Sequence, residues 1–258
     1  NRFMEKLTSC AVIFCGGKGS RLGTLGKKIN KSLLLVKNKP IIGHIIEKLL
    51  KVKIDKIILP LGYKGNDIKK YVIKNFSNEI LKFTFINTGI NTELSKRILK
   101  IRKYLPSDRS VLFINGDTIY NFNLINFFKS HVKSNQKISL ATFSPKIDFG
   151  LIKINKNRSL KFKKSEFVEN FQSKISNFRA YSGFAIIDCN YLKRFKFTFD
   201  KDFEIDMFNK AMKLKNVNIY NIKNSICFPI DNIKSLKFAN EVLNLKNWLF
   251  WLFIYKKR

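Results

Sequence analysis

The chain has 258 residues, of which 45% are hydrophobic, so it can bury the core of one large α/β domain and is not a disordered polypeptide. It carries 50 Lys and Arg against 18 Asp and Glu, a net charge of +32, which attracts nucleotides, nucleic acid and acidic lipid surfaces alike. The basic residues are spread along the chain rather than concentrated in one stretch, which favours a compositional bias over a nucleic-acid groove.

Other classes of protein are disfavoured by what the sequence lacks. The chain contains no run of about 18 apolar residues, the length that a helix needs to cross a bilayer. Its first ten residues lack the apolar core of a secretory signal. The cysteines show neither CxxC spacing nor a disulfide framework, so we expect reduced packing residues in a cytoplasmic protein. They are Cys10, Cys15, Cys189 and Cys227. His44 and His131 have no metal-ligand neighbours in the sequence and are expected in packing or surface positions.

Strands alternate with helices through the first half of the chain, which predicts βαβ units and a largely parallel sheet. We expect strands at 10–15, 56–62, 82–86 and 110–115. Helices are expected after Pro40, at 66–76 with Asn66 as the cap, near 93–105 and at 124–132. Such a sheet would bind a ligand at the carboxyl ends of its strands.

From about residue 137 the pattern changes to strands with short connections. We expect strands at 137–143, 151–155, 159–164, 180–188 and 216–222, with a helix near 203–213 and a last helix near 232–245. This second half would complete the ligand pocket.

A glycine-rich, basic stretch, CGGKGSRLGTLGKKINKS (15–32), follows the first strand. Glycines after a strand let backbone N–H groups approach phosphate oxygens, and Arg21 and Lys31 could neutralise phosphate charge. The stretch matches neither the Walker pattern nor GxGxxG. A mobile surface turn is the alternative interpretation.

Two aspartates follow apolar strands. Asp117, in FINGDTIY, is placed to hold Mg²⁺ against phosphates, and a turn residue is the alternative. Asp231, in CFPIDNIKSL, precedes a helix, so a helix N-cap is the alternative for it. Together with the glycine-rich loop, the two aspartates could hold one Mg²⁺ between a nucleoside triphosphate and a phosphate nucleophile.

In this order, GGKGSRL, Lys31, FINGDT and PIDNIKSL resemble the sugar-phosphate nucleotidyltransferases, and within them glucose-1-phosphate cytidylyltransferase. The segments 44–76, which includes GYKG, 86–105 and 138–154 are similar to the same enzymes, so the resemblance covers about residues 9–243. It implies a Rossmann-like (GT-A-like) α/β fold. We therefore expect a single domain with a mixed, mostly parallel sheet flanked by helices and a smaller sheet on the acceptor side.

The resemblance also implies the roles of individual residues. Arg21 would stabilise the leaving pyrophosphate, Lys31 would bridge the incoming phosphate and the α-phosphate, and Asp117 and Asp231 would be the metal ligands. The expected nucleotide-binding residues are Gly16, Gly17, Gly19, Ser20, Arg21, Arg97 and Gly116. The expected acceptor contacts are Lys164, Ser182, Gly183 and Glu204.

The sequence departs from the family pattern at several of these places. Ser32 replaces the proline after the catalytic lysine, which we expect to loosen the loop. Ser95 and Lys96 replace paired glycines before Arg97, near the base. The usual Glu-Lys pair of the acceptor side is not intact in FKKSE (162–166). The catalytic set is therefore kept better than the acceptor pocket.

We expect a nucleotidyltransferase domain over 1–246 and an apolar, basic tail over 247–258. The tail, NWLFWLFIYKKR, would pack on the core or a subunit interface of a homo-oligomer, or would anchor the protein peripherally on acidic lipids.

The expected function is Mg²⁺-dependent transfer of a nucleotidyl group, with CTP favoured, to a sugar 1-phosphate or similar phosphorylated small molecule, with release of pyrophosphate. Three alternatives remain at this point: guanylylation of heptose or mannose 1-phosphate, cytidylylation of a non-sugar phosphate, and a catalytically silent nucleotide-binding protein. Nucleic-acid binding is disfavoured.

Overall fold

The computed structural model describes residues 9–107, 109–143, 151–154, 160–163, 179–198, 202–223 and 225–243, and only the backbone within 151–154 and 160–163. Lys164 and the tail 247–258 therefore lie outside the described residues. Within the described part of the chain, no helix is both long and apolar enough to cross a membrane.

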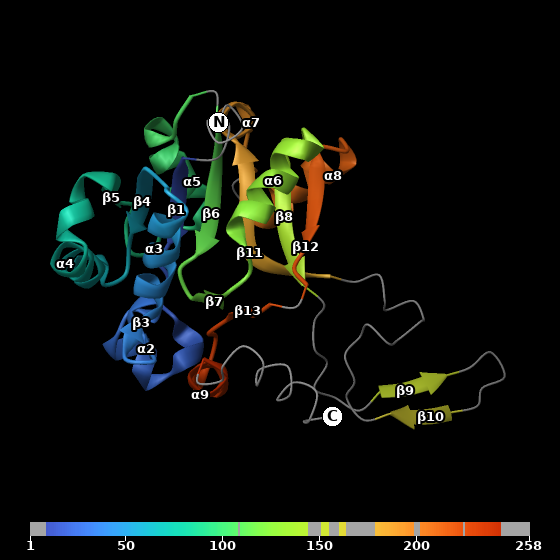
Figure 1. Ribbon diagram of the computed structural model, residues 1–258, viewed down its shortest axis with the longest axis horizontal. Helices are drawn as coiled ribbons and strands as arrows, with labels where there is room; N and C mark the ends of the chain where they lie inside the picture. Colours follow the sequence, from blue (N-terminus) through green and yellow to red (C-terminus); the bar gives the residue numbers. More distant parts are fainter. Residues whose placement is uncertain are drawn as a thin grey trace.

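Seven strands form the main sheet, in the spatial order β12, β8, β11, β6, β1, β4, β5 (Figure 1). The four strands from the first half of the chain are parallel to one another, β11 is antiparallel to β6 and β8, and β12 is parallel to β8. The sheet is thus mixed and mostly parallel, as predicted. The strands are β1 Cys10–Phe14, β4 Lys56–Leu61, β5 Phe83–Asn87, β6 Ser110–Asn115, β8 Ile138–Phe143, β11 Ala180–Asp188 and β12 Val217–Asn221.

Helices cover both faces of this sheet. They form because apolar residues recur every three or four positions: in the helix after Pro40, Ile41, Ile45 and Leu49 are all fully buried. The helices are α2 Thr24–Lys28, α3 Ile41–Lys51, α4 Gly65–Asn75, α5 Leu94–Ile101, α6 Leu124–Ser134, α7 Cys189–Arg194, α8 Phe203–Lys213 and α9 Ile233–Val242.

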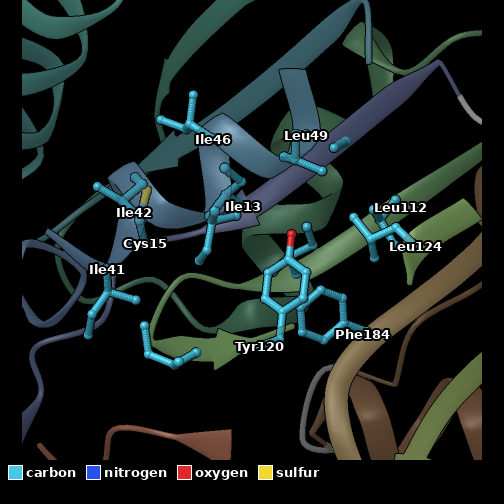
Figure 2. Close-up of a cluster of buried hydrophobic side chains, with 14 of the residues drawn as sticks. Ile13, Cys15, Ile41, Ile42, Ile46, Leu49, Leu112, Tyr120, Leu124 and Phe184 are labelled. Carbon is cyan, nitrogen blue, oxygen red and sulfur yellow. The ribbon is translucent and has the colours of Figure 1, made fainter. Parts of the chain in front are cut away.

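Strand β1 contributes to a hydrophobic core on each face, because successive side chains of a strand point to opposite sides. Ala11 and Ile13 face a core shared with α3, α4, α6 and α9, whereas Cys10 and Val12 face a core shared with α5, α7 and α8. Figure 2 shows the first core, where side chains of α3 gather with Ile13. The sheet is therefore covered on both sides and exposes the ends of its strands.

Short antiparallel ribbons complete the fold. Strand β7 (Thr118–Tyr120) pairs with β13 (Cys227–Pro229), and β2 (Leu35–Val36) pairs with β3 (Lys39–Pro40). The two strands predicted at 151–155 and 159–164 form a third ribbon, β9 (Leu151–Ile154) with β10 (Leu160–Lys163). These ribbons are the smaller sheets of the fold.

Some local features differ from what the sequence led us to expect. The N-cap of α4 is Lys64 rather than Asn66: the helix begins at Gly65, directly after Lys64 in a left-handed conformation (φ 51°), and Lys64 makes no side-chain cap bond to the helix. Helix α7 was not predicted; it is only six residues long, and the Asp188 carboxylate caps it by accepting from the Tyr191 N–H at 2.7 Å.

The cysteines and His131 are packing residues, as expected. All four cysteines are buried and free. His131 lies between the hydroxyls of Ser110 and Ser139, each 2.8 Å from a ring nitrogen. Burial lowers the pKa of His131 to about 4, so the ring is neutral near pH 7.

Candidate active site

Lys31 and two aspartates form the centre of the candidate site. The Lys31 Nζ lies 2.6 Å from Oδ2 of Asp117 and 2.6 Å from Oδ1 of Asp231. The three side chains are 16%, 24% and 37% exposed, respectively, so a ligand can reach them from solvent. The fold thus brings together three residues that the sequence singled out from distant segments.

The β7–β13 ribbon brings the two aspartates to the same place. Asp117 lies between β6 and β7, and Asp231 comes two residues after β13. Thr118 pairs with Pro229 in the ribbon, and the Ile230 N–H donates to the Asp117 carbonyl at 2.8 Å. Pairing of the backbones therefore fixes the positions of both carboxylates.

Asp231 is not the N-cap of α9, so its alternative interpretation is wrong. The cap is Asn232, whose Oδ1 accepts from the Ser235 N–H at 2.8 Å, and the Ser235 hydroxyl accepts from the Asn232 N–H at 3.1 Å. This reciprocal pair satisfies the end of the helix. The Asp231 carboxylate is left to face Lys31.

Lys31 is held in a short 3₁₀ turn, Lys31–Leu33, that Asn30 caps. The Asn30 Oδ1 accepts from the Ser32 N–H at 2.9 Å, and its Nδ2 donates to the carbonyls of Cys15 at 2.9 Å and Tyr63 at 2.7 Å. A proline at position 32 could not donate that bond, so Ser32 ties the loop where we expected it to loosen it. Sequence reasoning did not single out Asn30, although Asn before a helical turn is a capping signal.

The charge of Lys31 is strongly stabilised in this setting. Burial disfavours the ammonium form, but the adjacent Asp117 and Asp231 carboxylates outweigh burial and raise the pKa of Lys31. Lys31 is therefore a cation at any physiological pH, and it serves as the counter-charge of the two carboxylates.

The glycine-rich loop leads from β1 to this cluster. A Cβ added at Gly17 would meet no atom within 4 Å, and Gly17 does not have positive φ. The fold itself therefore gives no steric reason for a glycine at this exposed position. Close approach of a ligand to the backbone would be such a reason, because a side chain would occupy the space that the ligand needs.

Gly19 has a reason within the fold. Its φ of 63° is left-handed, and the Lys31 Cβ lies 3.3 Å from where a Gly19 Cβ would be. Its carbonyl oxygen would lie 2.4 Å from a Cβ added at Gly26 in α2. Gly19 and Gly26 thus let the loop fold closely over Lys31.

Ser20 and Arg21 lie in a 3₁₀ turn, Ser20–Leu22, on the outside of this loop. Both are exposed, and within the described residues the Arg21 guanidinium makes no hydrogen bond or ion pair. Arg21 is therefore available to an anion, and its predicted contact with pyrophosphate stays a prediction.

Arg97 lies beneath the loop rather than on its solvent side. It is 6% exposed, and its guanidinium donates to the Gly16 carbonyl at 3.1 Å and to the Thr88 hydroxyl. Of the residues that replace the family's paired glycines, Ser95 is 2% exposed and Lys96 pairs with Glu93 at 3.2 Å.

The other predicted contacts are placed around β6 and β11. A Cβ at Gly116 would lie 2.8 Å from the Ser32 hydroxyl, so this glycine permits close packing beside the lysine turn. The buried Ser182 hydroxyl donates to the Ala141 carbonyl at 2.7 Å. Gly183 has φ 80° at a register shift of β11, and bulges of this kind are common next to active sites.

Glu204, on α8, is electrostatically coupled to the cluster. Burial first, and then the nearby Asp202 and Asp117 carboxylates, raise the pKa of Glu204 to about 7. Glu204 thus lies close enough to Asp117 to be affected by its charge, and its predicted contact with the acceptor stays a prediction.

The chemistry of the donors fits Mg²⁺. One carboxylate oxygen of Asp117 and one of Asp231 face the same position, which the Lys31 ammonium occupies. No group of three His, Cys, Asp or Glu that could hold a metal occurs among the described residues. Mg²⁺ is commonly held by one or two carboxylates together with substrate phosphates, so two carboxylates are enough.

Comparison with known proteins defines the class. A family model described as nucleotidyl transferase matches residues 10–227. The chain therefore belongs to the nucleotidyl transferase family, and the curated proteins to which it is similar include sugar-phosphate nucleotidyltransferases.

Two relatives illustrate the range of this family. The "probable glucose-1-phosphate cytidylyltransferase" of Bacillus subtilis is 31% identical over 163 residues, 56% of this chain and 64% of that protein. A D-glycero-alpha-D-manno-heptose 1-phosphate guanylyltransferase of Aneurinibacillus thermoaerophilus is 27% identical over 198 residues, 75% of this chain and 82% of that protein. The match thus spans slightly less than two thirds of the first relative.

Solved structures support the fold. The structure of HddC from Yersinia pseudotuberculosis complexed with GMP-PN is similar with a TM-score of 0.62 at 21% identity, over 91% of this chain and 99% of that chain. At this identity the likeness establishes the fold alone. The predicted Rossmann-like fold is confirmed.

Proposed function

We propose that the protein transfers the nucleotidyl group of a nucleoside triphosphate, with CTP favoured, to a sugar 1-phosphate or a similar phosphorylated small molecule. The observation that carries the proposal is the Lys31 ammonium 2.6 Å from both carboxylates, beside a glycine-rich loop, in a chain of this family.

In the proposed reaction, a phosphate oxygen of the acceptor attacks the α-phosphorus of the nucleotide. A P–O bond forms there, the bond between the α-phosphorus and the oxygen bridging to the β-phosphate breaks, and pyrophosphate leaves with the electron pair. The attacking phosphate is already an anion, so no side chain has to remove a proton. Charge neutralisation and alignment are the main tasks of the protein.

The residues of the site suit those tasks. Lys31 would draw the acceptor phosphate and the α-phosphate together, the amide of Gly17 would approach the phosphate chain, and exposed Arg21 would stabilise the leaving pyrophosphate. Asp117 and Asp231 would hold Mg²⁺, which supplies charge stabilisation on the phosphate oxygens when bound. Glu204 would contact the acceptor.

The base is the finer part of the proposal. The cytidylyltransferase relative and the resemblance of several ordered segments favour CTP, whereas the guanylyltransferase relatives favour GTP with heptose 1-phosphate as the second candidate. Cytidylylation of a non-sugar phosphate and silent nucleotide binding are the remaining alternatives.

Pyrophosphate release tests the proposal. Purified protein with Mg²⁺ is given CTP, GTP, UTP, ATP or dTTP, each alone and with glucose, mannose or heptose 1-phosphate or a non-sugar phosphate. We expect release with one nucleotide and only when an acceptor is present. Release without any acceptor would indicate a hydrolase, and binding without release would support the silent alternative.

A further inference from the structure

Arg97 connects the ends of three adjacent parallel strands. Its guanidinium donates to the Gly16 carbonyl after β1 at 3.1 Å, to the Leu61 carbonyl at the end of β4 at 3.4 Å, and to the Thr88 hydroxyl after β5. It also donates to the Ile90 carbonyl at 3.4 Å. One side chain on α5 therefore fixes the floor of the glycine-rich loop.

Thr88 extends this network. It is fully buried, its hydroxyl donates to the Leu61 carbonyl at 2.7 Å, and its carbonyl accepts from the Lys100 Nζ at 2.8 Å. Within the described residues Arg97 forms no ion pair with a carboxylate, so its positive charge is balanced only by dipoles. Burying a cation without a carboxylate partner carries a desolvation cost. This cost suggests that the position of Arg97 has a role beyond stability.

The Arg97 contact sets the orientation of one peptide in the loop. The Gly16 carbonyl accepts from Arg97 and also from the Tyr63 N–H at 3.1 Å, so this oxygen points into the protein. The peptide bond is planar and trans, and the N–H of Gly17 therefore points the opposite way. Gly16 is buried and Gly17 is exposed, in agreement with this orientation.

Arg97 also explains two glycines. A Cβ added at Gly16 would lie 2.5 Å from the Arg97 Nη1, and one at Gly62 would lie 2.6 Å from the same atom. Both distances are far below van der Waals contact. These glycines make room for the guanidinium, whereas Gly17 has open space around it.

We propose that Arg97 is a positioning residue, which holds the Gly16 carbonyl inward so that the Gly17 amide faces the phosphate chain of the nucleotide. The inference rests on the proposed function, because it assumes that phosphates bind at this loop. The proposal differs from a role of Arg97 in recognising the base. A residue that orients the loop affects binding of the phosphate chain, which all nucleoside triphosphates share.

The distinguishing probe is inorganic tripolyphosphate, which has the phosphate chain and no base. Calorimetric titration with CTP, GTP and tripolyphosphate, each with Mg²⁺, is carried out on wild type, Arg97→Met and Arg97→Lys. We expect Arg97→Met to weaken binding of every probe that wild type binds by about tenfold or more, tripolyphosphate included, and Arg97→Lys to restore part of the loss.

Arg102→Met is the matched control. Arg102 is an arginine as well, half-buried where Arg97 is buried, and it donates to the carbonyls of Lys193 at 3.1 Å and Phe195 at 2.9 Å, away from the loop. Its variant should lose thermal stability as well, but it should bind all probes within about twofold of wild type. Loss of binding in Arg97→Met alone would show that stability is not the cause.

Gly62→Ala provides the test if Arg97→Met does not fold. The new methyl group would displace the guanidinium without removing its charge, and it would also lie 2.7 Å from the Gly16 carbonyl oxygen, so it should weaken tripolyphosphate binding as Arg97→Met does. Unchanged tripolyphosphate binding in the folded Arg97 or Gly62 variant, or a loss confined to one base, would overturn the inference while leaving the proposed function standing. A wild type that binds neither nucleotides nor tripolyphosphate would overturn both.

Discussion

The Lys31 Nζ lies 2.6 Å from Oδ1 of Asp231, a residue 200 positions further along the chain. The same ammonium lies 2.6 Å from Asp117, so one cation balances two carboxylates before any ligand arrives. The site is therefore assembled by the fold itself, and phosphates or a metal ion must compete with contacts that already exist.

This competition predicts an unusual property of Lys31→Met. Without the ammonium, the two carboxylates repel each other, and a divalent cation should bind about tenfold more tightly than in wild type. Turnover should fall by about a thousandfold or more, because the attacking phosphate loses its positioning charge. Binding of Mn²⁺, followed by electron paramagnetic resonance, measures the first effect without any assay of activity.

Lys39→Met is the control for Lys31→Met, because Lys39 pairs with Glu47 at 2.7 Å elsewhere on the surface. It should leave both Mn²⁺ binding and turnover unchanged. Weaker Mn²⁺ binding in Lys31→Met would mean that the carboxylates are held in place by the lysine rather than blocked by it.

Asp117→Asn and Asp231→Asn keep the shape of the side chains and remove the charge. Each should lower kcat by about a hundredfold or more, and the double variant should lose little beyond the worse single one, because the two act as one unit. Steady-state kinetics over a range of Mg²⁺ concentrations measures this. Asp67→Asn, at an exposed position of α4, is the control, and full additivity of the two losses would contradict a shared metal site.

Gly17→Ala separates ligand binding from folding. The added methyl group has open space and an allowed backbone, so the melting temperature should not fall, while the KM for the nucleotide should rise about tenfold. Gly19→Ala, with φ 63°, should lose about 1–2 kcal/mol of stability from strain. Normal nucleotide affinity in Gly17→Ala would place the phosphates elsewhere.

Glu204 predicts a pH dependence of stability. Burial, followed by Asp202 and Asp117, raises its pKa from 4.5 to about 7, so between these pH values the folded protein holds a proton that the unfolded chain has released. Stability contributed by this group therefore falls as pH rises from 4.5 to 7 and is level above that. Glu204→Gln removes the effect.

Melting temperatures across this pH range, in buffer with a metal chelator, check the Glu204 prediction. The melting temperature of Glu204→Gln minus that of wild type should be about 3–6 °C greater at pH 8 than at pH 4.5. Glu79→Gln, on an exposed ion pair with Lys82, should show no such trend. An advantage that does not change with pH would contradict the buried, coupled position of Glu204.

The strands were predictable because their signal is local. The expected strand at 110–115 and the expected helix at 203–213 match β6 and α8 residue for residue. Short elements such as α7 and β7 carry too few residues for a periodic pattern. An apolar strand was expected before Asp231, but nothing in its local sequence indicates that it pairs with β7. The β7–β13 ribbon, which brings Asp117 and Asp231 together, could therefore not be derived from the chain alone.

For the site, the sequence identified residue types and missed competition between neighbours. Asp231 and Asn232 are both good helix caps, and only the structure shows that Asn232 takes that place. The resemblance predicted a nucleotide-binding role for Arg97. The direction in which its side chain points depends on where β1, β4 and β5 end, which the sequence does not show. Asn30 went unnoticed because its bonds to Cys15 and Tyr63 join segments far apart in sequence.

Mass spectrometry of the products shows directly whether the protein transfers a nucleotidyl group to an acceptor. Wild type and Lys31→Met are incubated with Mg²⁺ and the nucleotide and acceptor pair found by pyrophosphate release. We expect a nucleoside monophosphate joined through its phosphate to the phosphate of the acceptor, formed one to one with pyrophosphate by wild type and not by Lys31→Met. Free nucleoside mono- or diphosphate as the product, or equal conversion by Lys31→Met, would contradict it.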